Sequence, residues 1–170
     1  MAKHPQTVAF YPGSFDPMTN GHVNMVERGL RVFDKVIIAI AHNSNKKAMF
    51  TLDERKDLIN QCFPDNPRVQ VVVFSGLMVQ AANAAGATSV LRGLRGVADF
   101  EYEFQLSTMN NLLSPQLETV FLMTEKSHFF VSSNLVREVA SLGGDVSALV
   151  PRPVLDALTA RRLAKLAAAT

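Results

Sequence analysis

The stretch TVAFYPGSFDPMTNGHVNMVERGLRVFDKVIIAIA, residues 7–41, predicts a β-strand, a helix and a second β-strand in succession. Thr7–Tyr11 is short, apolar and β-prone, and Lys35–Ala41 holds a continuous apolar run of the kind that a parallel sheet buries on both faces. Between them, His22–Phe33 has apolar side chains at the spacing of an amphipathic helix. Because two strands joined through a helix usually run parallel, the segment predicts a βαβ unit.

Strands and helices alternate in the same way over the rest of the chain. Further strands are expected at Val69–Phe74, Thr88–Leu91 and Glu118–Met123. Helices are expected from Thr51, where Glu54 completes a capping box, to about Phe63, over Met78–Ala85, Val97–Leu113 and Pro151–Ala169, and from Ser132 or Ser133 to the LGGD segment at 142–145. The alternation predicts an α/β fold: a single Rossmann-like domain over residues 1–170, with a five-stranded parallel sheet and helices on both faces.

The composition is typical of a compact globular domain and excludes several classes of protein. Of the 170 residues, 48% are apolar and 19% are charged, which argues against a disordered chain. The 17 basic and 15 acidic side chains leave a net charge of only +2, so binding to nucleic acid through bulk charge is not expected. Cys62 is the only cysteine, which excludes an intramolecular disulfide, and its apolar helical setting indicates a buried thiol.

The sequence contains neither the pattern of a signal peptide nor that of a membrane span. The segment MAKHPQTVAF at residues 1–10 lacks an apolar region long enough for a signal peptide. The longest strongly apolar run, Val36–Ala41, is far shorter than the roughly 20 residues that a transmembrane helix needs. We therefore expect a cytoplasmic protein that does not bind membranes.

Basic groups, hydroxyls and glycines follow the predicted strands, at the edge where a parallel sheet binds ligands. The residues concerned are, in chain order, Gly13, Ser14, Asp16, Asn20, His22, His42, Asn43, Ser44, Lys46, Lys47, Ser75, Gly76, Met78, Arg92, Gly93, Arg95, Gly96, Thr124, Lys126, His128, Ser132 and Ser133. Few carboxylates offset the basic side chains, so we expect this edge to bind an anion, and a polyphosphate fits it best. Neither a Walker loop nor a G-x-G-x-x-G loop is present, and the four histidines lack metal-ligand spacing.

The histidine at position 22 stands at the start of a predicted helix, where the partial positive charge of the helix disfavours a second cation. Thr19 and Asn20 are candidate caps for this helix, and Gly21 would let a ligand approach the backbone closely. The helix terminus is expected to lower the pKa of His22 and keep the ring neutral until a docked polyphosphate favours the imidazolium. The spacing alone leaves open a second interpretation, a capping turn with a surface histidine.

Several motifs are similar to those of known enzymes. Thr19–His22, TNGH, has the [HT]-x-G-H signature of the nucleotidyltransferase superfamily, and FFVSSNLVRE at 129–138 resembles that superfamily's second motif. LRGLRGVADFEYEFQLSTMN at 91–110 and SNKKAMFTLDER at 44–55 resemble the bacterial phosphopantetheine adenylyltransferase family, and the resemblance extends over about Val8–Val150. It implies reversible transfer of the adenylyl group of ATP to 4′-phosphopantetheine, which gives dephospho-coenzyme A and pyrophosphate in the penultimate step of coenzyme A biosynthesis. It also implies direct in-line attack without a covalent enzyme intermediate.

The resemblance assigns roles to residues at the predicted sheet edge. Its implied catalytic residues are His22, which would stabilise the transition state at the α-phosphate, Lys46, which would bridge the two reacting phosphates, and Arg95. The implied phosphopantetheine-binding residues are Ser14, Lys46, Met78 and Arg92. The implied ATP-binding residues are Ser14, Phe15, His22, Gly93, Leu94, Arg95, Glu103, His128, Phe129, Phe130, Val131, Ser132, Ser133 and Asn134, with Arg137 supporting the phosphate end.

Some of these residues also have simpler interpretations. Lys46 could be a solvated loop lysine, Met78 a helix core residue, and Ser132 with its neighbour a plain helix cap. Two positions depart from the family pattern: Asn134 stands where a third serine is usual, and His128 stands where an aromatic residue is often found near the adenine. These departures concern the contacts to ATP and not the reaction.

The resemblance implies Mg²⁺ bound with ATP as the cofactor, with no metal held by the protein itself. It implies a homohexamer with coenzyme A as a feedback ligand, and neither nucleic acid nor a membrane as a partner. Two other interpretations are another small transferase, such as a nicotinamide-mononucleotide adenylyltransferase or a glycerol-phosphate cytidylyltransferase, and a nucleotide-binding sensor without catalysis. The segment RGLRGVADFEYE at 92–103 argues against the first, and the presence of His22 and Lys46 argues against the second.

Overall fold

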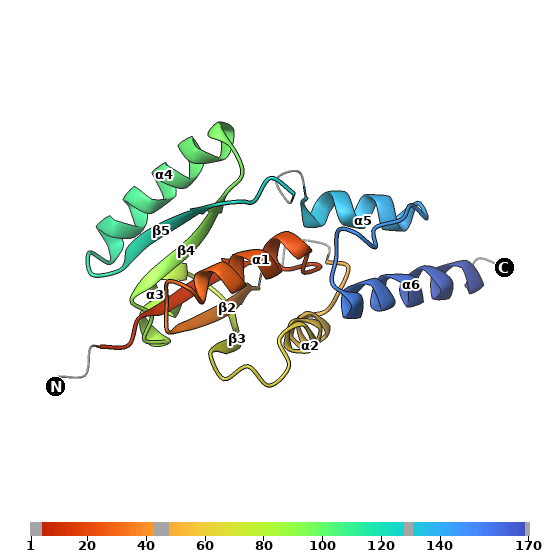
Figure 1. Cartoon of the computed structure of the whole chain (residues 1–170), viewed down its shortest axis with the longest axis horizontal. Helices are drawn as coiled ribbons and strands as arrows, with labels where there is room; N and C mark the ends of the chain where they lie inside the picture. Colours follow the sequence, from red (N-terminus) through yellow and green to blue (C-terminus); the bar gives the residue numbers. More distant parts are fainter. Residues whose placement is uncertain (1–4, 43–47, 128–130, 169–170) are drawn as a thin grey trace.

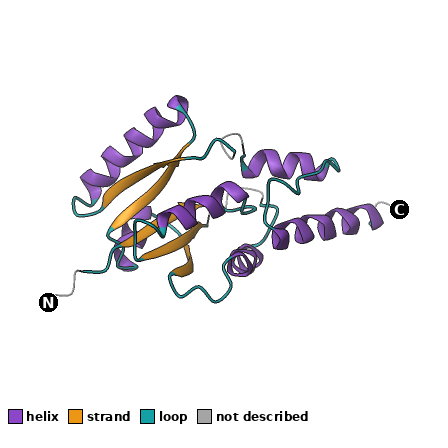
Figure 2. Ribbon diagram, in the orientation of Figure 1, coloured by secondary structure: helices purple, strands orange, loops and turns teal. Residues whose placement is uncertain are grey.

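The structure, a computed structural model, describes residues 5–42, 48–127 and 131–168. This part of the chain forms five strands and six helices, which alternate up to α5; α6 follows α5 directly. Figure 1 shows their arrangement. Their bounds are β1 Val8–Gly13, α1 Asn20–Gly29, β2 Lys35–Ala41, α2 Leu52–Cys62, β3 Val69–Phe74, α3 Met78–Ala84, β4 Ser89–Leu94, α4 Val97–Leu113, β5 Glu118–Met123, α5 Ser133–Ser141 and α6 Arg152–Ala167. The strands lie side by side in one sheet (Figure 2), and the predicted α/β fold is confirmed.

All five strands are parallel, and their order across the sheet is β3–β2–β1–β4–β5. β1 pairs with β2 over the whole of Val8–Gly13. Its pairing with β4 involves only Ala9 and Phe10, near the start of the strand. The chain thus moves outward from β1 to β2 and β3, and then crosses to the other side of β1 for β4 and β5. The carboxyl ends of β1 and β4 are left unpaired with each other, which opens the sheet at that edge.

Two strands extend further toward this edge than the sequence predicts. β1 continues beyond the expected end at Tyr11 to Gly13, because its pairing with β2 continues there. β4 continues beyond the expected end at Leu91 to Leu94, because β5 pairs with it over that length. Cross-strand hydrogen bonding, which a propensity argument does not include, accounts for both differences.

The first helix is shorter than predicted at its C-terminal end and longer at its start. α1 begins at Asn20, two residues before His22, because Thr19 is the residue that caps it. It ends at Gly29 instead of Phe33. The backbone N–H of Phe33 still donates to the Gly29 carbonyl at 2.8 Å, within a turn that keeps the buried phenyl ring over the core.

Helices cover both faces of the sheet. On one face, α1, α2, α5 and α6 pack against Ile38 of β2 and its neighbours. The buried residues that these helices contribute include Val26, Ile59, Val136 and Val154. On the other face, α3 packs against Ile37. α4 lies next to α3, because Asn83 Nδ2 donates to the hydroxyl of Ser114, the C-cap of α4, at 3.0 Å.

Three smaller expectations are also tested by the fold. The capping box of α2 is present, since Thr51 N–H donates to the Glu54 carboxylate at 2.7 Å and Glu54 N–H donates to the Thr51 hydroxyl at 3.2 Å. Cys62 is half-buried instead of fully buried, and burial raises the pKa of its thiol to about 11, so it is a weak nucleophile. In the described part of the chain, no helix combines the length and apolarity that a membrane span requires.

The centre of β2 is expected to be the most sensitive part of the core. Ile38→Ala should lower the free energy of unfolding by about 3 kcal/mol, because the fully buried side chain leaves a cavity when it is removed. The control is Val32→Ala, at a side chain that is 57% exposed, which should change the free energy by less than about 0.5 kcal/mol. Urea denaturation measures both variants, and equal effects would contradict the assigned core.

Candidate active site

Two adjoining cavities occupy the opening at the carboxyl ends of β1 and β4, the place where parallel sheets of this kind bind ligands. The first, the α1–α5 cavity, has a volume of about 530 Å³ and reaches His22 and the start of α5. The second, the α3–α4 cavity, has a volume of about 480 Å³ and reaches Met78 and the middle of α4. Both cavities are lined by Pro12, Gly13, Ser14, Arg92, Tyr102 and Glu103. Ligands in the two cavities would therefore come into direct contact.

The loop after β1 is fixed by a buried aromatic ring. Phe15 has a positive φ of 44°, and its ring packs edge-on against Tyr11 and His22, with ring centroids 5.4 Å and 5.1 Å apart. A Cβ at Gly13 would lie 2.8 Å from the Phe15 ring, so only glycine fits this position without a shift. The Phe15 side chain is a core group, and any contact it makes with a ligand must come from its backbone.

His22 is part of the cap of α1 and still leaves one ring nitrogen available. The His22 backbone N–H donates to the Thr19 hydroxyl at 3.4 Å, and the Thr19 backbone N–H donates to His22 Nδ1 at 3.1 Å. Because Nδ1 accepts this bond, the neutral ring carries its proton on Nε2, which has no hydrogen-bond partner among the described residues. Burial lowers the pKa of His22 to about 4, with a further contribution from the charge of Arg95. The predicted decrease in pKa is confirmed, but its main cause is burial.

An ion pair contributes to the walls of both cavities. Arg92 Nε donates to Glu103 Oε2 at 2.7 Å, a second bond joins Arg92 Nη2 to Glu103 Oε1, and Arg92 Nη1 donates to the Pro12 carbonyl at 3.2 Å. Glu103 is only 9% exposed. Burial acts to lower the pKa of Arg92, but the hydrogen bonds and charge of Glu103 outweigh it and raise the pKa. The guanidinium is therefore held rigidly, with its charge offset by a carboxylate.

A second arginine on the same edge has a much looser partner. Arg95 Nε donates to Asp99 Oδ2 at 2.9 Å, and the arginine side chain is 45% exposed. Both residues line the α1–α5 cavity. Exposed pairs of this spacing contribute about 0.5 kcal/mol or less, so an anion in the cavity would readily take the place of Asp99.

The N-terminus of α5 closes the α1–α5 cavity on the side opposite β4. Ser132 is its N-cap, and the Ser132 hydroxyl accepts from the Leu135 N–H at 3.2 Å. The Ser133 hydroxyl donates to the Pro17 carbonyl at 2.8 Å, which joins α5 to the loop after β1. The free backbone N–H groups of a helix start bind anions, and here they lie beside both serines in the cavity wall.

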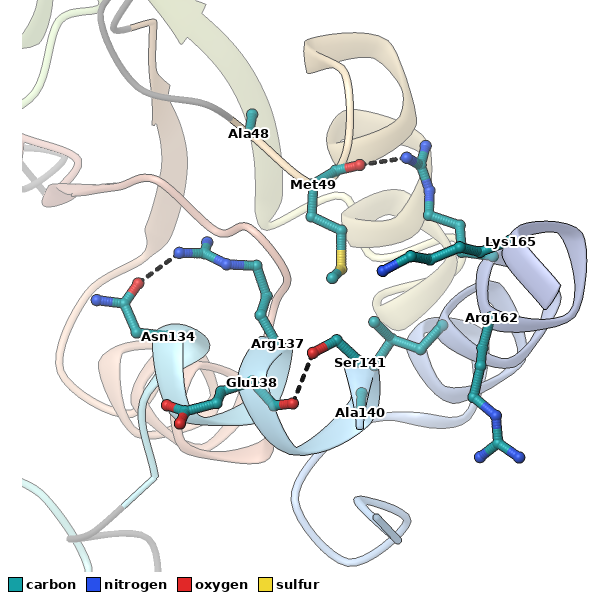
Figure 3. Close-up of a pocket in the computed structure, with 11 residues that line it drawn as sticks. Ala48, Met49, Asn134, Arg137, Glu138, Ala140, Ser141, Arg162 and Lys165 are labelled. Carbon is teal, nitrogen blue, oxygen red and sulfur yellow. Dashed lines mark hydrogen bonds between the residues drawn. The ribbon is translucent and has the colours of Figure 1, made fainter. Parts of the chain in front are cut away.

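Asn134 lies on the other side of α5. It lines a third cavity, of about 760 Å³, between α5, α6 and the segment before α2. Figure 3 shows Arg137 donating to the side chain of Asn134. Arg161 of α6 donates to the Met49 carbonyl. The bond from Arg137 Nη2 to Asn134 Oδ1 is 2.6 Å long. Asn134 is thus engaged in a contact within its own helix, away from the cavity that contains His22.

The structure brings most of the predicted site residues that it describes to the first two cavities. The α1–α5 cavity is lined by Ser14, His22, Gly93, Arg95, Glu103, Val131, Ser132 and Ser133 from the predicted ATP set. The α3–α4 cavity is lined by Ser14, Met78 and Arg92 from the predicted phosphopantetheine set. Leu94 is buried and lines neither cavity. The predicted site residues that lie outside the described part of the chain are Lys46, His128, Phe129 and Phe130.

Sequence reasoning missed several residues that line the cavities. They include Tyr11, Asp99, Tyr102, Leu106 and Asn110. Leu106 and Asn110 stand three and seven residues after Glu103, on one face of α4. A helical projection from Glu103 would therefore have identified them, whereas the proximity of Tyr11 depends on packing.

No group of three or more histidine, cysteine or acidic side chains that could hold a metal ion is found among the described residues. The two carboxylates nearest the cavities, Asp99 and Glu103, are paired with arginines. The charge around the cavities therefore favours an anion over a free cation.

Comparison with known proteins identifies close relatives. The chain matches the model of the cytidylyltransferase-like family over residues 10–139. It is 57% identical over 150 residues to the phosphopantetheine adenylyltransferase of Anaeromyxobacter sp. (strain K), a match that covers 88% of this chain and 92% of that protein. It is 49% identical over 157 residues to the phosphopantetheine adenylyltransferase of Geotalea daltonii, which covers 92% of this chain and 98% of the relative.

Solved structures share the fold at low sequence identity. A crystal structure from Vibrio parahaemolyticus, described provisionally as a nicotinate-nucleotide adenylyltransferase, superimposes with a TM-score of 0.66 at 17% identity, over 92% of this chain and 93% of the other. A lipopolysaccharide core biosynthesis protein from Thermoplasma volcanium superimposes with a TM-score of 0.55 at 18% identity, over 72% of this chain and 100% of the other. At such identities the likeness is one of fold.

The lowered pKa of His22 predicts a dependence of stability on pH. Between pH 6.5 and 4 the unfolded chain binds a proton at this ring that the folded chain does not, so the free energy of unfolding should fall with decreasing pH by up to about 3 kcal/mol. His22→Gln should remove this part of the pH slope while it keeps the capping box, because glutamine also accepts from the N-cap N–H. NMR titration of the ring tests the cause directly, and a pKa near 6.5 would contradict it.

Proposed function

Because this chain belongs to the phosphopantetheine adenylyltransferase family, within the cytidylyltransferase-like family, we propose that it transfers the adenylyl group of ATP to 4′-phosphopantetheine and releases pyrophosphate. The product is dephospho-coenzyme A, and the reaction is the penultimate step of coenzyme A biosynthesis. The observation that carries the proposal is the pair of adjoining cavities, which share Ser14 and the Arg92–Glu103 pair. Two substrates that react with each other need neighbouring sites of this kind.

The reaction requires no nucleophile from the protein. The attacking group is the phosphate of 4′-phosphopantetheine, whose second pKa is about 6 and which is mostly ionised at neutral pH. One of its oxygens forms a bond to the α-phosphorus of ATP while the bond from that phosphorus to the bridging oxygen of pyrophosphate breaks. The proposed attack is in line and reversible, with no covalent enzyme intermediate. The tasks left to the protein are to align two anions and to stabilise the charge that develops between them.

The stabilising donor in this proposal is His22. The bond from the Thr19 N–H to Nδ1 orients the ring before ATP binds and keeps the proton on Nε2. With a pKa of about 4 the ring starts as a neutral donor. As negative charge develops at the α-phosphate, the hydrogen bond from His22 Nε2 to that phosphate would become stronger than it is in the ground state. An interaction that is stronger in the transition state than in the ground state lowers the barrier.

The other cationic and helical groups would hold the triphosphate and the acceptor. Arg95 would exchange its exposed partner Asp99 for phosphate oxygens, and the start of α5 at Ser132 and Ser133 would bind the β- and γ-phosphates. Arg92 and Ser14 would contact the acceptor, with Lys46 bridging the reacting phosphates as in the family pattern. Apolar side chains of the α3–α4 cavity would receive the pantetheine arm, namely Phe74, Met78 and Leu106.

We propose that Mg²⁺ enters with ATP as part of the substrate. A metal held by the protein does not fit the described residues, because the carboxylates beside the cavities, Asp99 and Glu103, already bind arginines. The ion would offset charge on the triphosphate. Orientation of the α-phosphate remains the task of His22 and Arg95.

Two further proposals follow from the chemistry of the product. Coenzyme A contains the whole of dephospho-coenzyme A, so it fits the same two cavities and would act as a feedback ligand in competition with both substrates. The protein would work in the cytoplasm, the expected location of an ATP-dependent biosynthetic enzyme.

Assembly into a homohexamer is proposed on the exposed surface of α4. The helix leaves a run of apolar side chains exposed, which is unusual for a monomer. These side chains are Val97, Phe100, Tyr102, Phe104, Met109, Leu112 and Leu113. A single-chain arrangement would leave this surface in water, whereas contact between copies would cover it.

The acceptor is tested by pyrophosphate release from ATP and Mg²⁺ with 4′-phosphopantetheine, nicotinamide mononucleotide and glycerol 3-phosphate in parallel. Turnover is expected with 4′-phosphopantetheine alone. His22→Ala should lower kcat by about 100- to 1,000-fold, the usual loss for a donor to developing charge. His22→Gln keeps the helix cap and should lose activity to a similar extent, which separates catalysis from capping. Turnover with another acceptor would replace the proposed substrate, and no turnover with any would favour a nucleotide sensor.

The assembly is tested by light scattering on the purified protein. A hexamer should have about six times the 18.6 kDa mass of the chain. Leu112→Asp, at a side chain that is 75% exposed on α4, should reduce the mass, because a charge would be buried in the interface. Leu163→Asp on α6, which is 59% exposed, is the matched control and should leave the mass unchanged. A monomer mass for the wild type would overturn the proposal.

A further inference from the structure

The carboxylate of Asp16 joins three segments that are far apart in the sequence. Asp16 lies in the loop after β1, between Ser14 and the start of α1, and is only 3% exposed. Its Oδ1 accepts from the Phe50 backbone N–H at 2.9 Å. Its Oδ2 accepts from the Met49 N–H at 2.9 Å and from Arg137 Nη1 at 3.0 Å. The loop, the segment before α2 and helix α5 thus meet at a single side chain.

Arg137 connects this carboxylate to the start of α5. The same guanidinium also donates to the backbone carbonyl of Asp16 and, through Nη2, to Asn134 Oδ1 (Figure 3). One turn earlier, the Ser133 hydroxyl donates to the Pro17 carbonyl at 2.8 Å. The first turn of α5 is therefore attached to the loop of residues 14–17 at two points, and the Asp16 carboxylate supports one of them.

The segment before α2 has a second attachment that does not involve Asp16. Arg161 of α6 donates to the Met49 carbonyl and stacks over the Phe50 ring, with 4.6 Å from its guanidinium carbon to the ring centroid. Loss of the Asp16 carboxylate would leave these contacts in place. Helix α5 would lose the charged partner of Arg137, while the bonds from Arg137 to the Asp16 backbone carbonyl and from Ser133 to the Pro17 carbonyl would remain.

We propose that Asp16 is a positioning residue for the adenylyl transfer, acting through Arg137 to place the N-terminus of α5 relative to His22. This inference rests on the proposed function. Ser132, Ser133 and His22 line the same cavity, yet α5 and α1 are separated by more than a hundred residues of chain. Donors that stabilise charge in a transition state must be placed before the reaction, and an error of about 1 Å can cost about 100-fold in rate. The Asp16–Arg137 pair supplies that placement.

A carboxylate is the side chain that this position requires. Three N–H donors face the carboxylate: the backbone groups of Met49 and Phe50, and the guanidinium of Arg137. An asparagine would turn its NH₂ group toward at least one of these donors, and the half-buried Arg137 would lose its counter-charge. Asp16→Asn therefore weakens the proposed attachment while it leaves the volume of the side chain nearly unchanged.

The test compares kcat and KM in Asp16→Asn, Arg137→Met and Arg137→Lys at a temperature well below unfolding. Asp16→Asn and Arg137→Met should each lower kcat by about 30- to 100-fold, while KM for 4′-phosphopantetheine changes less than threefold, because the acceptor cavity does not include α5. Arg137→Lys retains one charged donor and should fall between the wild type and Arg137→Met. The double variant should be no slower than either single one, because the two side chains act as a unit.

Asp34→Asn is the matched control. Asp34 accepts from the Thr7 backbone N–H at 2.8 Å and from the Thr7 hydroxyl at 2.9 Å, and it precedes β2 at the opposite edge of the sheet. The same chemical change there should lower stability without changing kcat. Equal kcat values for Asp16→Asn and the wild type, or equal losses in Asp16→Asn and Asp34→Asn, would overturn the inference.

Amide hydrogen exchange without substrates separates this inference from the proposed function. Asp16→Asn should raise exchange in α5 by at least tenfold relative to α1, and Asp34→Asn should leave α5 unchanged. If the wild type turns over none of the tested acceptors, the proposed function fails. The positioning of α5 is then judged by this exchange and by the affinity for ATP with Mg²⁺, which should fall about tenfold in Asp16→Asn. Unchanged exchange or unchanged affinity would overturn it.

Discussion

The separation of β1 from β4 creates the opening in which the two proposed substrate cavities lie. Both strands lie inside the sheet, but the crossovers that leave them cover opposite faces. Among the residues that the structure describes, no connection closes the carboxyl edge between them. Backbone and side chains from both strand ends line the opening, with Gly13 and Arg92 shared by two cavities. The two cavities adjoin because they begin from the same pair of strands. The proposed direct transfer between two bound substrates would depend on this arrangement.

Both arginines that line the opening, Arg92 and Arg95, are paired with carboxylates in the free protein. Arg92 is neutralised by Glu103 in a rigid, mostly buried pair, whereas Arg95 is itself exposed and pairs with the partly exposed carboxylate of Asp99. The rigid pair is costly to break and therefore acts as a wall with a fixed shape. The exposed pair costs little to exchange, so its guanidinium is the one available to a phosphate. The two arginine–carboxylate pairs thus have different proposed roles because they differ in burial.

His22 shows how one side chain combines a structural and a chemical task. Nδ1 completes the cap of α1 by accepting from Thr19, and burial keeps the ring neutral with its proton on Nε2. The cap is therefore what sets the orientation of the donor. Asp16, in the loop that leads to α1, also orients a part of the site, because its carboxylate binds Arg137 of α5.

Local patterns in the sequence determined the α/β alternation, the capping box of α2, Thr19 as a cap of α1, and most of the polar residues at the strand ends. Apolar periodicity and cap chemistry act over a few residues, and parallel strands bring their ends to one edge. Only the tertiary structure decided that Glu103 pairs with Arg92, that Asn134 faces a different cavity from Ser133, and that the buried carboxylate of Asp16 joins α5 to the first loop. These contacts join residues from separate elements or depend on which side of a helix faces the sheet. Packing sets them, and no local pattern in the sequence encodes the distances involved.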